Sequence, residues 1–415
     1  MEKSRNRTVN FLCCIFIFFG ISFTIIDPLI PLISEKLNIG YDRIGLILLV
    51  SSSVSLVATF LSGRFSDRYS LKKIIILGLI LVLVGFLIYG IYFNLAIFIL
   101  TLILFRSGCG ILDSSVHTYA ARLYYRQHGP VFIKLDFFWY IGAIISPLAI
   151  SIILLLNLEP KFAFFAFALA TLLIVIFFSK ISSDVKTRRD KDIKDYEISI
   201  MYETEDPKTK DIIGARSYFA IIKNKIIVFS CLGLFLFIGL FSILSTWLTT
   251  YLKDFNIPIS FGSIMLSVFW IFNALGVFII SKIIKSSNEI SLLLLCTIMG
   301  VISTIVYCLV PVIYVKVVFL IFQAVFYSSL FPLLNAVAVH ENVEASGTVL
   351  GTTISVSIVG LIVFQPLTGY LMEWFGKNGI NYLLLGVAVI VFAAIFILFK
   401  LVSTKYKTRF KILKY

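Results

Sequence analysis

Long apolar runs separated by short polar segments dominate the pattern of this chain. Each run has the length that an α-helix needs to cross a hydrocarbon core of about 30 Å. Only helices and closed barrels satisfy their backbone groups within lipid, and these runs are too long for barrel strands. The pattern therefore predicts twelve membrane-spanning helices, at residues 11–33, 43–62, 74–93, 95–118, 132–156, 162–180, 226–251, 260–282, 290–312, 314–338, 346–372 and 380–400.

One long polar segment interrupts the series after the sixth run. It covers residues 182–225 and separates two groups of six runs, at 1–181 and 226–400, and a basic tail follows at 401–415. We expect the segment to be a solvated linker. The fold class expected is all-α integral membrane, with twelve transmembrane helices in two pseudo-symmetric six-helix bundles around a central cavity.

The two halves also echo each other weakly in sequence. The fifth run contains Gly142-Ala-Ile-Ile-Ser-Pro147, and the eleventh contains Gly360-Leu-Ile-Val-Phe-Gln-Pro366. Each stretch belongs to the fifth helix of its half. Two similar halves are typical of transporters.

Charge decides the orientation. If the N-terminus is cytoplasmic, 29 of the 36 Lys and Arg residues lie on the inner side, and six lie outside at Lys36, Arg43, Lys161, Lys253, Lys316 and Lys377. Cytoplasmic loops carry such an excess. We expect a multi-pass protein of the cell membrane with both termini in the cytoplasm. The first run lacks a signal-peptide cleavage pattern, so we interpret it as a retained span.

Composition excludes several classes of function. Sixty per cent of the residues are apolar and 14 per cent are charged, against about 25 per cent charged in soluble domains. The net charge of +14 is spread between the runs, so nucleic acid is not an expected partner. The six cysteines have no C-x-x-C spacing, which argues against disulfides and zinc. With no phosphate-binding loop and three scattered histidines, we expect no enzyme, no cofactor and no ATP drive.

The segment after the second run carries a signature. It reads Gly63-Arg-Phe-Ser-Asp67-Arg68-Tyr-Ser-Leu-Lys72-Lys73. This resembles the G-x-x-x-D-[RK]-x-G-[RK]-[RK] motif of the major facilitator superfamily, with departures at Ser70 and Leu71. The resemblance implies a gating contact between the halves, made by Gly63, Asp67, Arg68 and Lys72, in which Gly63 permits a close approach or a tight turn. The alternative is a charged turn that only fixes topology.

Other stretches narrow the resemblance. Arg106-Ser-Gly-Cys-Gly110 looks like the R-x-x-x-G pattern of the superfamily, and Asp27-Pro-Leu-Ile-Pro31 and Gly108-Cys-Gly-Ile-Leu-Asp113-Ser-Ser-Val-His117 are similar to the fucose:proton symporter-like branch. That similarity implies proton coupling through Asp27 and substrate binding or coupling through Asp113. His117 stands where the branch has Asn.

The fifth run adds a third match with two departures. Leu135-Asp136-Phe-Phe-Trp139-Tyr140-Ile-Gly142-Ala-Ile-Ile contains the Gly-Ala-Ile stretch of the branch. Asp136 stands where members have His or Gln, and Trp139 stands where some have a sugar-contacting Asn. We interpret His117, Asp136, Trp139 and Tyr140 as substrate-binding candidates.

The fourth run presents charges on nearly one helical face. Arg106 and Asp113 are seven residues apart, and Asp113 and His117 are four apart. Lipid would not tolerate such a stripe, so it must face protein or a water-filled path. We propose Asp27 as the leading proton acceptor and Asp113 and Arg106 as a coupled pair. Alternatively, Asp27 caps a kink before Pro28, Asp113 is a structural partner of Arg106, and His117 and Asp136 merely meet water.

The second half has no acidic or basic residue in the interior of its assigned spans, because Lys282, Lys316 and Lys400 lie at or near span ends. Its substrate-binding candidates are Trp270, Asn273, Gln323, Tyr327 and Gln365. An aromatic face beside an amide suits a polar ring or an amphipathic solute. The alternative for each is ordinary helix packing.

Three functions remain open. The first is proton-coupled import of a sugar or another small polar molecule by alternating access, by a permease that works as a monomer. The second is proton-coupled efflux of drugs or metabolites, although Ser146 replaces a glycine before Pro147 that such exporters carry. The third, less favoured, is a membrane sensor or enzyme on the same scaffold.

Overall fold

The computed structural model describes residues 2–91, 94–123, 128–180, 224–283, 289–341 and 346–412. Side chains are not described at 2–7, 67–68, 121–122, 128–130, 133, 346–348 and 406–412. Throughout these ranges the regular structure is helical, and twelve helical segments are long and apolar enough to cross a membrane. Each of the twelve overlaps a span expected from the sequence. The all-α membrane fold is therefore confirmed, whereas most of the expected linker at 182–225 lies outside the described residues.

The N-terminal lobe contains the first six spans. The first is built from α1, the short 3-10 helix η1 and α2, and one helix forms each of the others. Their bounds are α1 Glu2–Thr24, η1 Asp27–Leu29, α2 Ile30–Leu37, α3 Tyr41–Arg68, α4 Leu71–Ile91, α5 Leu95–Leu123, α6 His128–Leu155 and α7 Lys161–Ser179.

The C-terminal lobe contains the other six spans. Its first helix continues into the short α11, and its fourth span is divided into α14 and α15. The bounds are α10 Lys225–Thr246, α11 Leu248–Lys253, α12 Ile259–Ile283, α13 Glu289–Leu309, α14 Ile313–Tyr327, α15 Leu330–Glu341, α16 Ser346–Phe375 and α17 Lys377–Ile412.

Three spans are interrupted. Pro28 lies in η1, and Pro332 follows the break between α14 and α15. A proline has no N–H to donate to the carbonyl four residues earlier, so the helix opens there. The break at Trp247, between α10 and α11, has no proline. We expected an unbroken helix to residue 251 there, and the interruption instead lets α11 pack against η1 and α2 of the other lobe.

The two lobes repeat one packing scheme. α1 crosses α6 in the N-terminal lobe as α10 crosses α16 in the C-terminal lobe. A Cβ added at Gly142 would lie 2.0 Å from the Ile17 carbonyl oxygen, and one added at Gly360 would lie 2.4 Å from that of Phe235. Both crossings require the glycine that the weak sequence echo contains, because nothing larger fits between the backbones.

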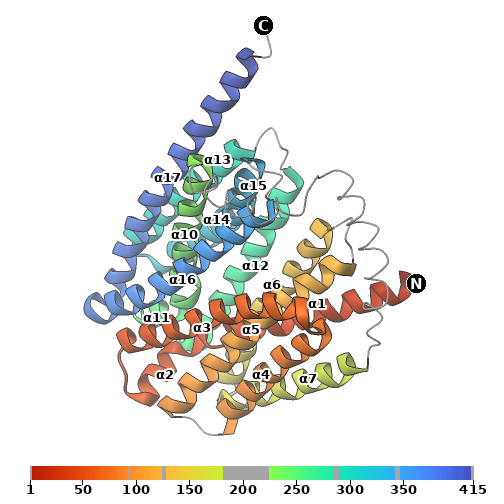
Figure 1. Ribbon diagram of the computed structural model, residues 1–415. Coiled ribbons are helices and arrows are strands. Elements are labelled where there is room, and N and C mark those ends of the chain that lie inside the picture. Colours follow the sequence, from red (N-terminus) through yellow and green to blue (C-terminus); the bar gives the residue numbers. More distant parts are fainter. Residues whose placement is uncertain are drawn as a thin grey trace.

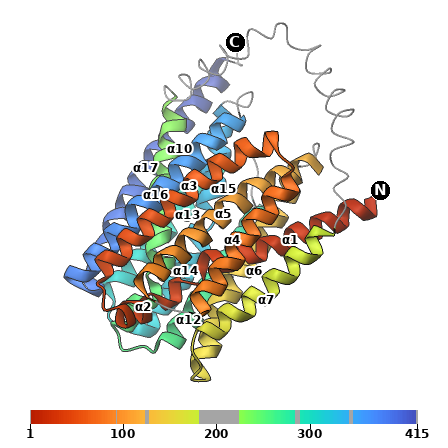
Figure 2. The ribbon, with the colours of Figure 1, turned by 60° about the horizontal axis from the view of Figure 1, so that its bottom comes forward.

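The lobes meet along two seams. α3 packs against α16, as Figure 2 shows, and α6 packs against α12. Because the number of spans is even, both chain ends lie on one side of the bundle, which we call the terminal side; the opposite side is the far side. In Figure 1 the helices of the two lobes diverge toward the chain ends.

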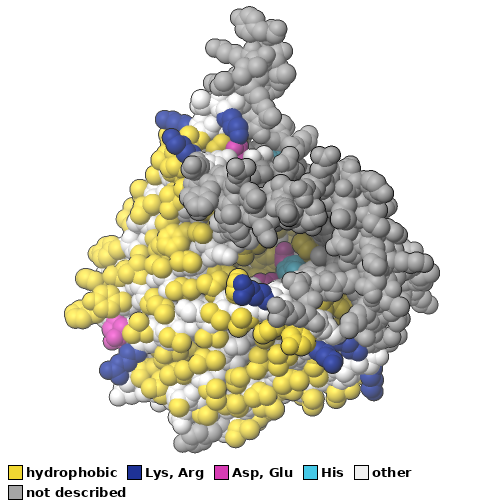
Figure 3. All heavy atoms as spheres, viewed as in Figure 1, with side chains coloured by type: hydrophobic (Ala, Val, Ile, Leu, Met, Phe, Trp, Pro, Cys, Tyr) yellow, Lys and Arg dark blue, Asp and Glu magenta, His cyan; other side chains and the backbone are white. Residues whose placement is uncertain are grey.

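Contacts between the lobes on the far side are polar and aromatic. Lys253 of α11 pairs with Glu35 of α2. The backbone N–H of Tyr41 donates to Glu373 Oε2 at 2.7 Å, and the rings of Tyr41 and Trp247 lie 6.0 Å apart. Figure 3 shows a hollow between the lobes, in which acidic and histidine side chains are visible. The structure is thus closed across the far side and hollowed between the lobes.

Candidate functional site

Two charged side chains lie buried in the N-terminal lobe. Asp27 of η1 and Arg106 of α5 are each 3% exposed, and they act on each other electrostatically. The guanidinium of Arg106 also lies over the Phe23 ring, 3.9 Å from its centroid. Among the residues that the structure describes, Oδ1 of Asp27 has no hydrogen-bond partner.

The structure corrects the expected pairing of Arg106 with Asp113. Arg106 lies over the Phe23 ring and forms no ion pair with Asp113 among the described residues, whereas Asp113 pairs with His117. Seven residues return a helix to nearly the same face, but they also advance it by about 10 Å. A shared face therefore did not bring the two charges into contact.

Aromatic residues from both lobes meet beside this pair. The rings of Trp139 and Trp270 lie 5.2 Å apart, edge to face, and Trp139 lies 5.9 Å from Phe23. The Tyr140 ring lies 6.3 Å from the Trp270 ring. Phe241, which belongs to the C-terminal lobe like Trp270, lies 5.3 Å from the same tryptophan. We call Phe23, Trp139, Tyr140, Phe241 and Trp270 the aromatic cluster.

Polar atoms around the aromatic cluster lack partners. They are Asp27 Oδ1, both indole nitrogens of Trp139 and Trp270, and the amide oxygen and nitrogen of Asn273. Each is buried, and a buried polar group without a hydrogen bond costs about 1–3 kcal/mol. Asn273 lies three residues after Trp270 on α12, and α12 packs against η1. A solute with donors and acceptors could satisfy all of these atoms.

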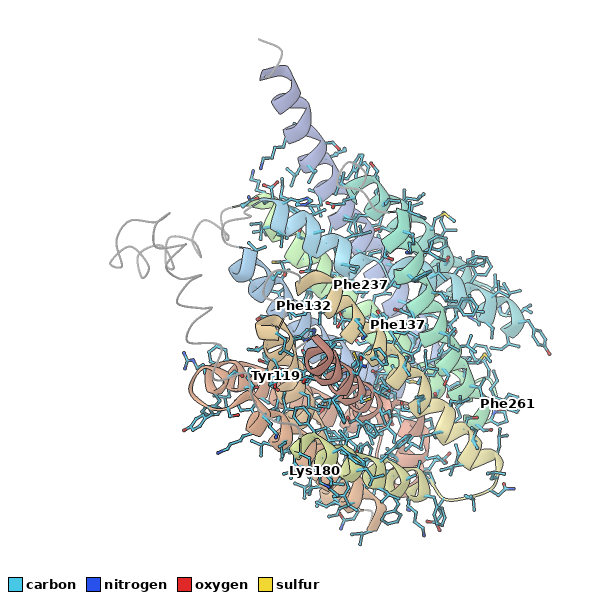
Figure 4. All side chains as sticks on the ribbon, turned by 90° about the vertical axis from the view of Figure 1, so that its right-hand side faces the viewer. Tyr119, Phe132, Phe137, Lys180, Phe237 and Phe261 are labelled. Carbon is cyan, nitrogen blue, oxygen red and sulfur yellow. The ribbon has the colours of Figure 1, made fainter. Side chains whose placement is uncertain are left out.

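A second polar group lies nearer the terminal side. His117 Nδ1 lies 3.1 Å from Asp113 Oδ1, and Nε2 lies 3.6 Å from Asp136 Oδ1. In the stick view, Tyr119 near the end of α5 and Phe132 near the start of α6 lie at the same end of the lobe (Figure 4). His117, two residues before Tyr119, shares that end. The structure therefore joins three of the predicted site residues, away from the aromatic cluster.

The comparisons with known proteins bear on this architecture. The family model described as Major Facilitator Superfamily matches residues 12–357. The chain belongs to the major facilitator superfamily. No curated protein matches it in sequence.

Solved structures of the superfamily fold resemble the chain along its length. A bacterial homolog of the human lysosomal transporter Spinster, inward-facing and unoccupied, has a TM-score of 0.73 at 12% identity, covering 96% of this chain and 98% of that one. A point mutant of the nucleoside transporter NupG gives 0.72 at 13% identity, covering 94% and 100%. A point mutant of the E. coli fucose:proton symporter FucP gives 0.61 at 16% identity, covering 96% and 99%. At these identities the likeness shows the fold.

The superfamily motif lies at the end of α3. The side chains of Asp67 and Arg68 are outside those the structure describes. Gly63 lies within the helix, not in a tight turn, and among the described atoms an added Cβ would meet Ser114 Oγ at 3.7 Å. Lys72 donates to the Ser179 carbonyl at 2.7 Å, which ties α4 to the end of α7 within one lobe.

The remaining candidates of the C-terminal lobe are divided. Gln365 of α16 accepts a hydrogen bond from Ser52 of α3 at 2.8 Å, so it belongs to a seam between the lobes. Tyr327 bonds to Thr304 of α13 at 2.9 Å, and Gln323 donates to the Ser303 carbonyl at 3.4 Å. The shared face of Gln323 and Tyr327 is thus turned toward α13. Oε1 of Gln323 has no hydrogen-bond partner among the described residues, so the assignment of these two residues to substrate binding stays a prediction.

Lys316 is the residue whose position the sequence analysis mistook. We counted it among the charges of the outer loops, but it lies in α14 with 2% exposure. Its ammonium donates to Tyr251 Oη at 2.9 Å and to the Tyr307 carbonyl, and it lies 4.9 Å from the Tyr307 ring centroid. Tyr251 belongs to α11, which covers the lysine. The second half therefore does hold a charge within a span.

The aromatic surroundings of Lys316 extend to α17. Tyr251 Oη donates to Asn381 Oδ1 at 2.9 Å, and the Phe255 ring centroid lies 5.5 Å from the ammonium. The sequence did offer a signal for the burial of Lys316, because this lysine lies within an apolar run, two positions after Tyr314. We expected its long side chain to reach water at the end of the helix, as such side chains commonly do.

Proposed function

We propose that this superfamily member is a proton-coupled importer of a small neutral polar solute, with a sugar as the first class to test. The observation that carries the proposal is the buried carboxyl group of Asp27 beside Arg106. Its Oδ1 is unpaired, and it lies next to an aromatic cluster shared by the two lobes. An ionisable group at membrane depth is costly and marks an ion or substrate pathway.

Alternating access supplies the mechanism. In transporters of two similar halves, the lobes rock around a site between them, and the access changes from one side to the other. Protonation of Asp27 would cancel one negative charge and leave the charge of Arg106 unbalanced. Solute and proton are coupled if each biases the same equilibrium between the two arrangements. The residues at the α6–α12 seam, Trp139 and Trp270, would change their contact in that movement.

The chemistry of the unpaired atoms supports a neutral solute. Two indole N–H groups and the amide of Asn273 donate, while Asp27 Oδ1 and the amide oxygen accept. The ring faces suit a flat apolar surface. The opposite charges of Asp27 and Arg106 balance at this point, so the site offers no net charge to an ion. A hexose or a nucleoside has the required mixture of hydroxyl groups and apolar faces.

Efflux of an amphipathic compound is the second candidate. The observation in its favour is the extent of aromatic surface, which also includes Phe19 and Phe269 next to the cluster. Ser146 argues against it, because its hydroxyl bonds to Thr24 at 2.5 Å where exporters carry a glycine. Expression in a drug-sensitive host separates the two, since only efflux confers resistance.

We place the terminal side in the cytoplasm of a cell membrane. The charge distribution supports this, because the Lys and Arg residues gather on that side. The contacts between Glu35 and Lys253 and between Tyr41 and Glu373 would then close the outer face. The arrangement would be the inward-facing state of a monomer, and the motif around Asp67 and Arg68 would act when the lobes close on the inner side.

A proton-flux screen tests the function. The protein is reconstituted in vesicles with a pH-sensitive dye inside, and hexoses, nucleosides and dipeptides are added in turn. We expect one class to drive proton movement. Asp27→Asn should abolish uphill transport and spare solute exchange, because the amide cannot ionise.

The matched control is Glu159→Gln. Glu159 is an exposed far-side carboxylate paired with Lys161 at 2.9 Å, so its variant should behave as wild type. Persistence of full uphill transport in Asp27→Asn would refute the role of this carboxyl group.

A further inference from the structure

One imidazole bridges two helices of the N-terminal lobe. His117 of α5 places Nδ1 2.9 Å from the Asp113 carbonyl oxygen and 3.1 Å from its Oδ1. Nε2 points toward Asp136 Oδ1 on α6, at 3.6 Å. Phe16 of α1 and Phe132 of α6 hold the ring edge to face, at 5.0 and 4.9 Å. The two aromatic contacts fix the ring plane, so that both nitrogens face a carboxylate.

This group differs from Asp27 and Arg106 in its access to water. The side chains of His117, Asp113 and Asp136 are 27%, 41% and 60% exposed. Acidic and histidine side chains are visible in the hollow of Figure 3. Asp27, by contrast, is buried. The lobe therefore holds two ionisable groups, one buried and one exposed to solvent.

Protonation of the imidazole changes this group as a unit. A neutral imidazole donates from one nitrogen, whereas an imidazolium donates from both. Only the imidazolium can serve Asp113 and Asp136 together, and the cluster then carries a net charge of −1 instead of −2.

The other titratable groups next to the cluster are few in the part of the chain that the structure describes. Lys134 on α6 donates to Asn10 of α1 at 3.1 Å, and it acts electrostatically on Cys13 of α1. Tyr140, four residues after Asp136, is affected by the charge of that carboxylate, and Cys109, four residues before Asp113 on α5, is affected by the charge of Asp113. The two aspartates are the charged groups that act on the imidazole directly.

We propose that His117, Asp113 and Asp136 form a second proton-binding site, through which the transport cycle exchanges its proton with the cytoplasm. This rests on the proposed function. In the exchange, Nε2–H of the imidazolium gives its proton to a water molecule of the hollow, and the bonding pair stays on the nitrogen. The neutral ring keeps its Nδ1–H bond to Asp113 and loses its donor to Asp136, so α5 and α6 are held together less firmly.

The first test needs no solute. The imidazole signals of isotope-labelled protein in lipid nanodiscs are followed by NMR as the pH changes. Asp136→Asn should move the titration midpoint of His117 to lower pH by roughly one unit, because it removes one carboxylate beside the cation. His340, paired with Glu289 at 3.0 Å in the other lobe, is the internal control and should not move. An unchanged midpoint for His117 would overturn the proposal.

The second test separates a proton site from a structural tie. Proton flux is measured in vesicles with fucose, a nucleoside and a dipeptide as probes, while the pH is varied on one side at a time. In His117→Asn, the proton flux should no longer depend on the pH of the terminal side. It should still depend on the pH of the far side. A lower flux with both dependences intact would show a structural tie only, and a changed solute KM alone would show a substrate contact. Either result refutes the proposal, while uphill transport lost in Asp27→Asn would leave the proposed function standing.

Discussion

Gly142→Ala tests the helix crossing that positions the aromatic cluster. The new methyl group would lie 2.0 Å from the Ile17 carbonyl oxygen, and ordinary contacts of a Cβ begin at 3.4 Å. The backbones of α1 and α6 must therefore separate by up to 1.4 Å. Rotation of a side chain cannot relieve the clash, because the opposing atom belongs to the backbone of a helix.

The energetic cost follows from three terms. Overpacking costs about 1–3 kcal/mol. The hydrogen bond from α1 to α6 between Thr24 and Ser146, at 2.5 Å, would be stretched or lost, which adds about 1 kcal/mol. Against these, alanine is favoured over glycine within a helix by about 1 kcal/mol. We expect a net destabilisation of about 1–3 kcal/mol.

Transport should fall further than stability. Trp139 lies on α6 within one turn of Gly142, and its carbonyl oxygen would lie 2.2 Å from a Cβ at Gly20 of α1. A shift of about 1 Å in the residues that position a reacting group can cost roughly a hundredfold in rate. The assays are thermal unfolding in detergent and initial uptake rates in vesicles, at matched protein amounts.

The control is Gly386→Ala in α17. A Cβ at Gly386 meets no atom within 4 Å, so this variant gains the helix propensity of alanine without a clash and should be slightly stabilised. If Gly142→Ala were as stable and as active as Gly386→Ala, the crossing would not depend on the glycine, and the reasoning would fail.

Two further predictions address the other buried groups. Trp270→Phe keeps an aromatic ring but removes an unpaired indole N–H, so the KM for the solute should rise about tenfold with the uptake rate at saturation preserved; an unchanged KM would exclude this donor. Lys316→Ala leaves Tyr251 without its donor and opens a cavity, which should lower stability by about 2–4 kcal/mol, whereas Lys161→Ala at an exposed site should change it by less than about 1 kcal/mol; equal effects would show that Lys316 is not held as described.

Several features of the site were accessible from the sequence because they are local. Asp27, Arg106 and the Trp270–Asn273 pair lie in apolar runs, and a polar residue at membrane depth is conspicuous. The neighbours Asp113 and His117, four residues apart, do bond as helical spacing predicts. The ion pair of His117 with Asp136 depends on how α5 lies against α6, so spacing along one helix could not predict it.

The errors concern residues whose partners come from distant segments. Tyr327 and Gln323 share a face of α14, but only the packing of α13 decides that they bond to Thr304 and to the Ser303 carbonyl there. Lys316 is enclosed because α11 folds over it after a break at Trp247, and no proline marks that break. The partners in both cases come from other helices, so the residues around each position do not reveal them.

By itself the amino-acid sequence determined the twelve spans, their division into two groups of six and the superfamily. In lipid, each helix must form the hydrogen bonds of its own backbone groups. Hydropathy and loop charge are therefore local properties that can be recognised from neighbouring residues. The tertiary structure alone decided that Arg106 lies over Phe23 while Asp113 pairs with His117, and that Trp139 meets Trp270 across the lobes. These contacts depend on the rotation and the approach of whole helices, which small residues such as Gly142 and Gly360 set through packing between segments far apart in the chain.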